Sequence, residues 1–310
     1  MRYESESLRN HVGEILNEIH CEQLVVIDCD LAKSTTSAMY RDAHPEHFIE
    51  CGISETSAMS IASGLAMEGK KPVYVNFSMF LIGSAWTQLR QACYANLNIT
   101  LIGTHPGMDD GPDGASHHAN EDISLSRVLP NMRVLVPSSL AELHACMKLA
   151  IAYEGPVFIR CSRDVVAKIP DRNEYVSAFG RLDLVHDEGN DIMIIFEGTA
   201  SLCAMETYAK LKDEGYHCKV VNALSIKPFD KSKFLKLSSS SKLIVSIENH
   251  SVISGLGGIV AENLSALDQH PKLLRIGVED VFTESGKIAN LKAKYGLDAN
   301  KIMERIKANL

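Results

Sequence analysis

The chain has 310 residues, 45% of them hydrophobic, which is enough to build the cores of two globular domains. Its formal net charge of −8 argues against a nucleic-acid-binding surface, and no apolar stretch approaches the ~20 residues of a membrane span. The polar N-terminus shows no signal-peptide core, and the 8 cysteines form no CxxC pair. We therefore expect a cytoplasmic protein with reduced thiols and with neither a nucleic-acid nor a membrane partner.

Short apolar runs alternate with helical patterns along the first half of the chain. The sequence predicts strands at 24–30, 72–77, 99–105, 132–139 and 156–162, and helices at about 53–68, 83–96, 118–128 and 139–153. Strands that are buried on both faces and separated by helices are typical of a doubly wound parallel sheet.

A charged segment with Pro and Gly, residues 166–191, interrupts this rhythm and indicates a linker. After it, the sequence predicts strands at 191–198, 217–224, 242–249 and 273–278, with helices at about 200–214, 255–268 and 286–293. We expect an α/β protein of two doubly wound domains, residues 1–175 and 186–310.

The helix predicted from about residue 53 carries a glutamate in an unusual place. Its apolar positions repeat with helical spacing and predict one buried face, made of Ala58, Ile61, Ala62, Leu65 and Ala66. Glu55 precedes Ala58 by three positions and therefore lies on the same face. Two interpretations stay open from the residues alone: a carboxylate that acts in a partly buried site, or a solvated first-turn residue favoured by the helix dipole.

The segment after strand 99–105 carries the richest chemistry, because ligands of parallel α/β sheets bind beyond the carboxyl ends of the strands. THPGMDDGPDGASHH (104–118) places several imidazoles and carboxylates there: His105, Asp109, Asp110, Asp113, His117 and His118. These groups could bind a metal ion, present imidazoles to an anionic or polyhydroxy substrate, or only shape a turn; their spacing matches no specific metal motif. Arg163, at the end of strand 156–162, suits an anion contact or a surface ion pair.

Several common motifs are absent. The sequence contains no GxGxxG dinucleotide fingerprint, no GxxxxGK[ST] phosphate loop and no GxSxG nucleophile elbow. GLGG at 255–258 opens a predicted helix, where it could cradle a phosphate or allow close packing.

Taken together, these motifs resemble the C-terminal half of transketolase, in order and over nearly the whole chain. The matching segments are DLAKS (30–34), GISE (52–55), PVYVNFSMF (72–80), THPGMDDGPDGASHH (104–118), SRD (162–164), ENHSVISGLGG (248–258) and RIGVEDVFTESG (275–286). The resemblance implies a pyrimidine-binding domain that binds thiamine diphosphate, followed by a transketolase C-terminal domain that organises the dimer more than the chemistry.

The resemblance also implies roles for individual residues. Glu55 would hydrogen-bond the aminopyrimidine of thiamine diphosphate and help the cofactor lose its reactive proton, and His117 would assist proton transfer at the substrate. The cofactor pocket would be formed by Asp30, Leu31, Glu55, Phe77 and Phe80. The substrate would be bound by Ser34, His105, Asp113, His117 and Arg163, with Ser34, His105 and Arg163 around its terminal phosphate. Asp110 and His118 match no such role, and no residue of this chain is expected to bind a metal.

Two departures from the family pattern shape the prediction. Transketolase holds Mg²⁺ and the diphosphate of the cofactor through a GDG…N segment in its N-terminal half, and no GDG occurs here. The resemblance therefore implies a separate N-terminal-section subunit that carries this motif, in an α2β2 assembly. Gly83 stands where many transketolases place an aromatic residue, which bears on substrate preference.

The predicted function is transfer of a two-carbon ketol group between a ketose phosphate and an aldose phosphate, by a pair of subunits that uses thiamine diphosphate and Mg²⁺. Close variants are a transketolase for an unusual sugar phosphate and a reaction like that of deoxyxylulose-phosphate synthase. Two further alternatives are the β subunit of a 2-oxoacid dehydrogenase E1, a family that lacks the phosphate loop in this form, and a non-catalytic partner subunit that kept the fold.

Overall fold

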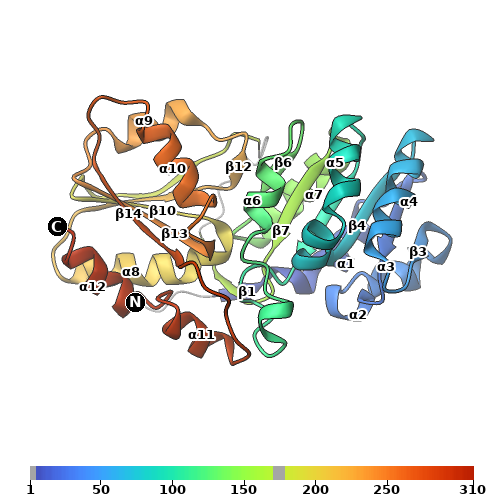
Figure 1. The fold of residues 1–310 in the computed structure, drawn as a ribbon, viewed down its shortest axis with the longest axis horizontal. Helices are drawn as coiled ribbons and strands as arrows, with labels where there is room; N and C mark the ends of the chain where they lie inside the picture. The colour runs from blue at the N-terminus through green and yellow to red at the C-terminus, as the bar shows by residue number, and fades with distance from the viewer. Residues whose placement is uncertain (1–4, 170–178) are drawn as a thin grey trace.

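The computed structural model describes residues 5–169 and 179–310. These residues form two α/β units that lie side by side, each built on its own sheet (Figure 1). Short connecting elements complete them: α2 Ala32–Thr35, the 3-10 helices η1 Leu8–His11, η2 Pro45–His47, η4 Gly114–Ser116 and η5 Gly198–Ala200, and the π-helical turn η3 Met79–Ser84. Within the described ranges, no helix combines the length and the apolarity that a membrane crossing needs.

The first sheet has the strand order β12-β6-β7-β5-β4-β2-β3. All strands but β12 come from the first half of the chain and run parallel: β2 Leu24–Asp28, β3 Phe48–Glu50, β4 Lys71–Phe77, β5 Thr100–Thr104, β6 Arg133–Leu135 and β7 Val157–Cys161. β2, β5 and β7 are buried along their whole length, as expected of parallel strands between two helix layers.

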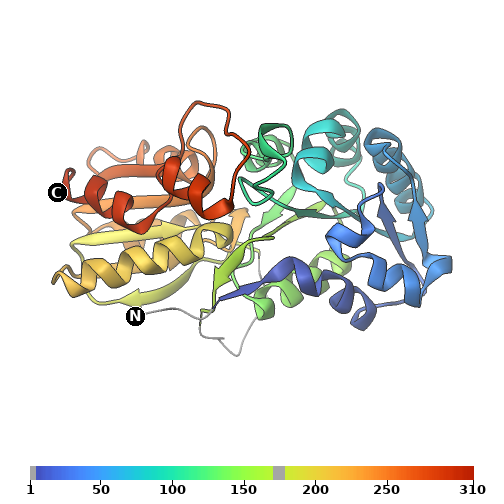
Figure 2. The same ribbon diagram turned by 90° about the horizontal axis from the view of Figure 1, so that it is seen from below.

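Helices cover both faces of this sheet (Figure 2). One face packs against α4 Glu55–Met67, α5 Trp86–Tyr94 and α6 Asp122–Arg127. The other face packs against α1 Val12–Glu18, α3 Ala38–Ala43 and α7 Leu140–Ala152. Successive residues of one strand serve the two cores: Tyr74 of β4 joins the first core, and Val73 and Val75 join the second.

The second sheet has the strand order β14-β13-β10-β11-β9. Four strands run parallel, β10 Ile192–Phe196, β11 Cys218–Asn222, β13 Leu243–Ser251 and β14 Lys272–Val278, and β9 Asp183–Asp187 is an antiparallel edge. Its two faces are covered by α8 Ser201–Asp213, α11 Ile288–Lys294 and α12 Ala299–Lys307, and by α9 Lys231–Ser238 and α10 Leu256–Leu264.

Three features bind the two units together. β12 Ser225–Lys227 comes from the second half but pairs antiparallel with β6, so it covers the edge of the first sheet. One hydrophobic core runs through both units and includes Phe158 and Ile259. At the same boundary, the fully buried Arg160 forms ion pairs with Asp122 of the first unit (2.8 Å) and Glu197 of the second (3.2 Å).

The structure confirms the predicted class, with two doubly wound sheets, and each predicted strand is present. The helix expected at 118–128 begins only at Asp122, because Ala119 forms bridges with Pro106 and Gly107 that keep the preceding residues out of the helix. The expected linker 166–191 contains part of β8 Val165–Ala167, which pairs with β1 Ser5–Ser7, and all of β9. The proposed end of the first domain, residue 175, lies outside the described residues, and the division into domains 1–175 and 186–310 stays a proposal.

Candidate active site

The carboxyl ends of four neighbouring parallel strands bring most of the predicted site residues to one edge of the first sheet. The strands are β2, β4, β5 and β7. β2 leads to Asp30, Leu31 and Ser34, β4 ends at Phe77 and leads to Phe80, β5 leads into the loop 104–118, and β7 leads to Arg163. Glu55 begins α4, which contacts both β4 and η3.

Glu55 lies at the rim of the site and not in the core. α4 packs on the sheet through Ala58, Met59 and Ala62, whereas Ile61 is 40% exposed. The buried face of the helix is therefore narrower than the sequence predicts. The Glu55 side chain is partly buried and lies near Cys29, whose thiol pKa is raised to about 11 by burial, with a smaller contribution from the Glu55 charge. Within residues 5–169 and 179–310, no hydrogen bond or ion pair engages the Glu55 carboxylate. This acid is therefore available to a ligand.

The turn after β2 is fixed by buried and exposed carboxylates. Asp28 is fully buried and accepts from the backbone N–H of Leu31 at 2.7 Å, and burial raises the pKa of Asp28 to about 6. Asp30 has φ +62°, and its backbone N–H donates to Oε1 of Glu50 at 2.8 Å. These bonds fix an exposed Asp30 and a half-buried Leu31 just after the carboxyl end of β2.

Aromatic rings form a wall at the ends of β4 and β5. The ring centroids of Phe77 and Phe80 are 6.2 Å apart, and His105 lies 3.8 Å from Phe77. His117 meets Phe80 edge to face at 5.2 Å. Phe80 is carried by the π-helical turn η3, an irregularity that is common at functional sites. The wall can hold a flat ring and exclude water.

Two guanidinium groups and a neutral imidazole lie beside this wall. His105 is buried, and its pKa falls to about 2, first because of burial and then because of the nearby Arg163 and Arg9. The pKa of Arg9 is also lowered, by burial and then by Arg163. Arg9 donates to the backbone carbonyl of Ser34 at 2.8 Å, and its Nε is buried without a hydrogen-bond partner among the described residues. Because the charges of Arg9 and Arg163 both act on His105, two cations are available on this side of the wall to bind an anion.

Sequence reasoning missed Arg9. It lies in η1, in a stretch that reads only as a polar N-terminus, and long-range pairing brings it to the site. Its backbone N–H donates to the carbonyl of Ser162 at 3.0 Å, and Ser7 donates to the carbonyl of Arg163 at 2.8 Å. The one local sign in the sequence is an arginine two residues after a Ser-rich start. That sign is too weak to predict a site residue.

The loop 104–118 holds a compact acidic group. One ligand atom from each of Asp110, Asp113 and His117 lies within 4.8 Å of the others, a spacing that a single cation could bridge. Asp113 is exposed and Asp110 is buried. Exposed acidic groups often gather without a metal, so this group assigns none.

The GLGG segment is not a free phosphate cradle. The Glu248 carboxylate accepts from the backbone N–H groups of Leu256 (2.6 Å) and Gly257 (2.9 Å) at the start of α10. A Cβ atom on Gly255 would lie 2.0 Å from Oε2 of Glu248. The helix N-terminus is therefore filled by a carboxylate of the chain itself, and the close-packing interpretation is confirmed.

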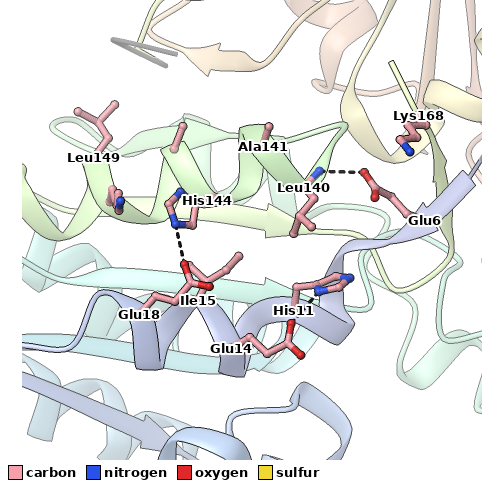
Figure 3. A pocket seen from close by; sticks show the side chains of 12 residues that line it. Glu6, His11, Glu14, Ile15, Glu18, Leu140, Ala141, His144, Leu149 and Lys168 are labelled. Carbon is pink, nitrogen blue, oxygen red and sulfur yellow. Dashed lines mark hydrogen bonds and ion pairs between the residues drawn. The ribbon is translucent and has the colours of Figure 1, made fainter. Parts of the chain in front are cut away.

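A cavity of about 890 Å³ lies elsewhere, between α1 and α7 (Figure 3). Its polar lining is largely paired: His11 with Glu14 at 2.9 Å, and His144 with Glu18 at 3.0 Å. It lies on the sheet face opposite α4 and contains none of the predicted site residues, so we assign the site to the strand ends instead.

Comparison with known proteins identifies the family. Residues 5–168 match the family model of the transketolase pyrimidine binding domain, and residues 180–302 match that of the transketolase C-terminal domain. The chain belongs to the transketolase family. The predicted resemblance is thereby confirmed for both halves of the chain.

Individual relatives of this transketolase-family chain agree. A protein of Methanocaldococcus jannaschii named for a transketolase C-terminal section is 37% identical over 97% of this chain and 95% of its own length. A 6-deoxy-6-sulfo-D-fructose transketolase subunit of Clostridium sp. is 32% identical over 91% of this chain and 87% of that subunit. A solved split-gene transketolase, described as an inactive β4 tetramer, is 36% identical with a TM-score of 0.86, over 98% of both chains.

The transketolase-family residues present here fit one side of thiamine diphosphate. Glu55, whose carboxylate has no partner among residues 5–169 and 179–310, and a wall of rings that includes Phe77 and Phe80 suit the aminopyrimidine. In the part of the chain that the structure describes, Asp110, Asp113 and His117 are the one set of side chains close enough together to share a cation, and they lie in the loop 104–118. No second set of ligands for a diphosphate-bound metal is found there.

Proposed function

We propose that this chain is the C-terminal-section subunit of a two-subunit transketolase, which transfers a two-carbon ketol group from a ketose phosphate to an aldose phosphate. One observation carries the proposal. A carboxylate that has no partner among the described residues, a wall of aromatic rings and two guanidinium groups lie at the carboxyl edge of the first sheet. Each matches one need of the reaction: a cofactor contact, a dry site and an anion anchor.

The cofactor side belongs to Glu55 and its neighbours. Thiamine diphosphate, when bound, supplies the nucleophilic carbon and the electron sink for breaking and forming the carbon–carbon bond. Glu55 would hydrogen-bond the aminopyrimidine, and no side chain of the described residues competes for its carboxylate. Phe77 and Phe80 would pack against the cofactor and exclude water, and Asp30 and Leu31, after the end of β2, would help to hold it.

The substrate side belongs to the loop 104–118 and the arginines. Arg163, Arg9 and Ser34 bind the terminal phosphate, and His105 adds a hydrogen bond without adding charge, because it stays neutral. His117, which lies against Phe80, moves a proton at a hydroxyl of the substrate. Asp113 accepts a hydrogen bond from a second hydroxyl.

A partner chain completes the site. Ile53 is 83% exposed beside Glu55, and the neighbouring Phe80 is only partly buried, so the rim of the site is open to another protein. We assign Mg²⁺ and the diphosphate contacts to an N-terminal-section subunit with a GDG…N motif, in an α2β2 assembly. The related split-gene chain is described as inactive when it forms a tetramer by itself, which supports the need for such a partner.

A transketolase for an unusual anionic sugar is the second candidate. A relative is named for 6-deoxy-6-sulfo-D-fructose, whose terminal group is a sulfonate. Phosphate and sulfonate both present several oxygens to the Arg9 and Arg163 guanidinium groups, so the anion site suits either.

Reconstitution tests the proposal. The chain is mixed with its N-terminal-section partner, thiamine diphosphate and Mg²⁺, and xylulose 5-phosphate is supplied with ribose 5-phosphate; 6-deoxy-6-sulfofructose replaces the donor in a parallel assay. Ketol transfer by the pair, and not by either chain alone, supports the proposal. Transfer from a 2-oxoacid to a lipoyl domain, with no ketol transfer, would instead identify an E1 β subunit.

A further inference from the structure

The second half of the chain reaches into the candidate site through one side chain. Asn249, near the end of β13, is fully buried against the loop 104–118. Its Oδ1 accepts from the backbone N–H of Met108 at 3.1 Å, and its Nδ2 donates to Oδ1 of Asp109 at 2.8 Å. A Cβ atom on Gly107 would lie 2.2 Å from the Asn249 carbonyl oxygen, so the loop and β13 are in direct contact.

Asp109 links Asn249 to Arg163 through hydrogen bonds. Its second oxygen, Oδ2, accepts from Ser162 Oγ at 2.9 Å and from the backbone N–H groups of Arg163 and Asp164, both at 3.0 Å. The Arg163 guanidinium in turn donates to the backbone carbonyls of Asp109 (2.8 Å) and Asp110 (2.9 Å). Asp109 is itself fully buried, so water cannot replace a lost partner easily.

The Asn249 backbone is fixed from its own side of the boundary. Its N–H donates to Oε1 of Glu197 at 2.8 Å, and its carbonyl accepts from Arg160 at 2.8 Å. Another segment of the second half of the chain also contacts the loop 104–118, because the backbone N–H of Gly286 donates to the carbonyl of Gly111 at 3.1 Å. Figure 1 shows this segment, which leads into α11, alongside the loop.

We propose that Asn249 is a positioning residue for the phosphate side of the active site: through Asp109, it sets where the Arg163 guanidinium stands. The second half of the chain then contributes to substrate recognition, in addition to any role in assembly. This inference rests on the proposed transketolase function, because it assigns Arg163 to the phosphate.

The first experiment uses the reconstituted pair with β-hydroxypyruvate as donor, so that the acceptor carries the only sugar phosphate. kcat/KM is measured for the aldose phosphate that the wild-type pair uses fastest among erythrose 4-phosphate, ribose 5-phosphate and glyceraldehyde 3-phosphate, and for the same aldose without phosphate. Asn249→Ala is expected to lower the preference for the phosphorylated sugar by about tenfold, mainly through KM.

Asn222→Ala is the matched control. Asn222 is also a buried asparagine of the second half that bonds to the first, through Ser138 Oγ (2.8 Å) and Glu142 Oε1 (3.0 Å), and it does not touch the loop. It should lose stability as Asn249→Ala does but keep the preference of the wild type. A loss of preference in both variants would mean that a general loss of packing is responsible, and would overturn the inference.

A rescue pair separates positioning from folding. Asn249→Asp sets two carboxylates against each other and should reduce the preference. Adding Asp109→Asn restores a donor and an acceptor at that contact and keeps an acceptor for Ser162, Arg163 and Asp164. The double variant should recover most of the preference, and failure to recover it while folded contradicts the proposal.

Hydrogen exchange on the chain alone supplies a readout that does not depend on activity. Amides of residues 104–119 and 160–166 should exchange faster in Asn249→Ala than in the wild type and in Asn222→Ala. If the wild-type pair shows no ketol transfer, the proposed function fails. If the wild-type pair is active but Asn249→Ala keeps both the preference and the exchange pattern, the inference about Asn249 fails by itself.

Discussion

The ring of His105 lies against the ring of Phe77 with centroids 3.8 Å apart, and its Nδ1 contacts Thr104 Oγ1 at 2.9 Å. His105 is buried, and the charges of Arg163 and Arg9 act on its ring. The protonated form is disfavoured first because burial removes water from the ring, and then because the nearby Arg163 and Arg9 already carry positive charge. His105 can therefore contribute a hydrogen bond to an anion across the physiological pH range.

This environment predicts a pH dependence of stability. The pKa of His105 is about 2 in the folded chain and about 6.5 when unfolded. Between these values the unfolded state binds more protons, so stability rises with pH up to about 6.5 and is lost as pH falls below it. His105→Gln should reduce the slope of the unfolding free energy between pH 5 and 6.5 by up to ~1.4 kcal/mol per pH unit.

Urea unfolding at several pH values measures that slope. His270→Gln, at an exposed histidine, is the control and should leave the slope unchanged. If His105→Gln unfolds with the same pH dependence as the wild type, the buried neutral imidazole is not what the structure indicates.

The paired guanidinium groups predict a selective effect on phosphorylated substrates. Removing a hydrogen bond to a charged group costs about 1.5–3 kcal/mol, so Arg163→Met and Arg9→Met should each raise KM for a sugar phosphate about 10- to 100-fold. The unphosphorylated sugar should be affected much less. Arg41→Met, at a half-buried surface arginine paired with Asp42, is the control. Equal losses on both sugars would place the anion contact elsewhere.

The buried ion pairs at the boundary predict a large effect on stability. Arg160→Met leaves Asp122 and Glu197 buried without their cation, which should cost about 3–5 kcal/mol of unfolding free energy. Arg41→Met removes an exposed pair and should cost no more than ~1 kcal/mol. Chemical denaturation measures the unfolding free energy of both variants. A similarly small loss in the two would show that Arg160 does not hold the units together.

The arrangement of strands was largely predictable, because each buried strand carries a dense run of Val, Ile and Leu. LVVID and PVYVNF became β2 and β4 at the expected places. β12 was not predictable, because Ser225–Lys227 is short and its pairing with β6 depends on a contact about 90 residues away in sequence. β9 was not predicted, because Asp183–Asp187 carries charged residues, which are tolerated in a strand at the edge of a sheet.

Local motifs indicate part of the candidate site, whereas residues that reach it through tertiary packing are not visible in the sequence. GISE and the loop 104–118 point to Glu55 and His117 as candidates, and their roles stay predictions. Arg9 and Asn249 reach the site only through tertiary packing, so periodicity gives no sign of them. Likewise, the sequence GLGG cannot reveal that Glu248 fills the helix N-terminus.

Ketol transfer by the reconstituted pair carrying Glu55→Gln is the most direct test of the central claim, that this acid serves the cofactor. The rate should fall about 10²- to 10⁴-fold, with assembly and unfolding midpoint unchanged, because Gln keeps the shape but cannot exchange the proton. Glu68→Gln, at the other end of α4, should keep the wild-type rate. A wild-type rate in Glu55→Gln would contradict the account and favour a non-catalytic partner subunit.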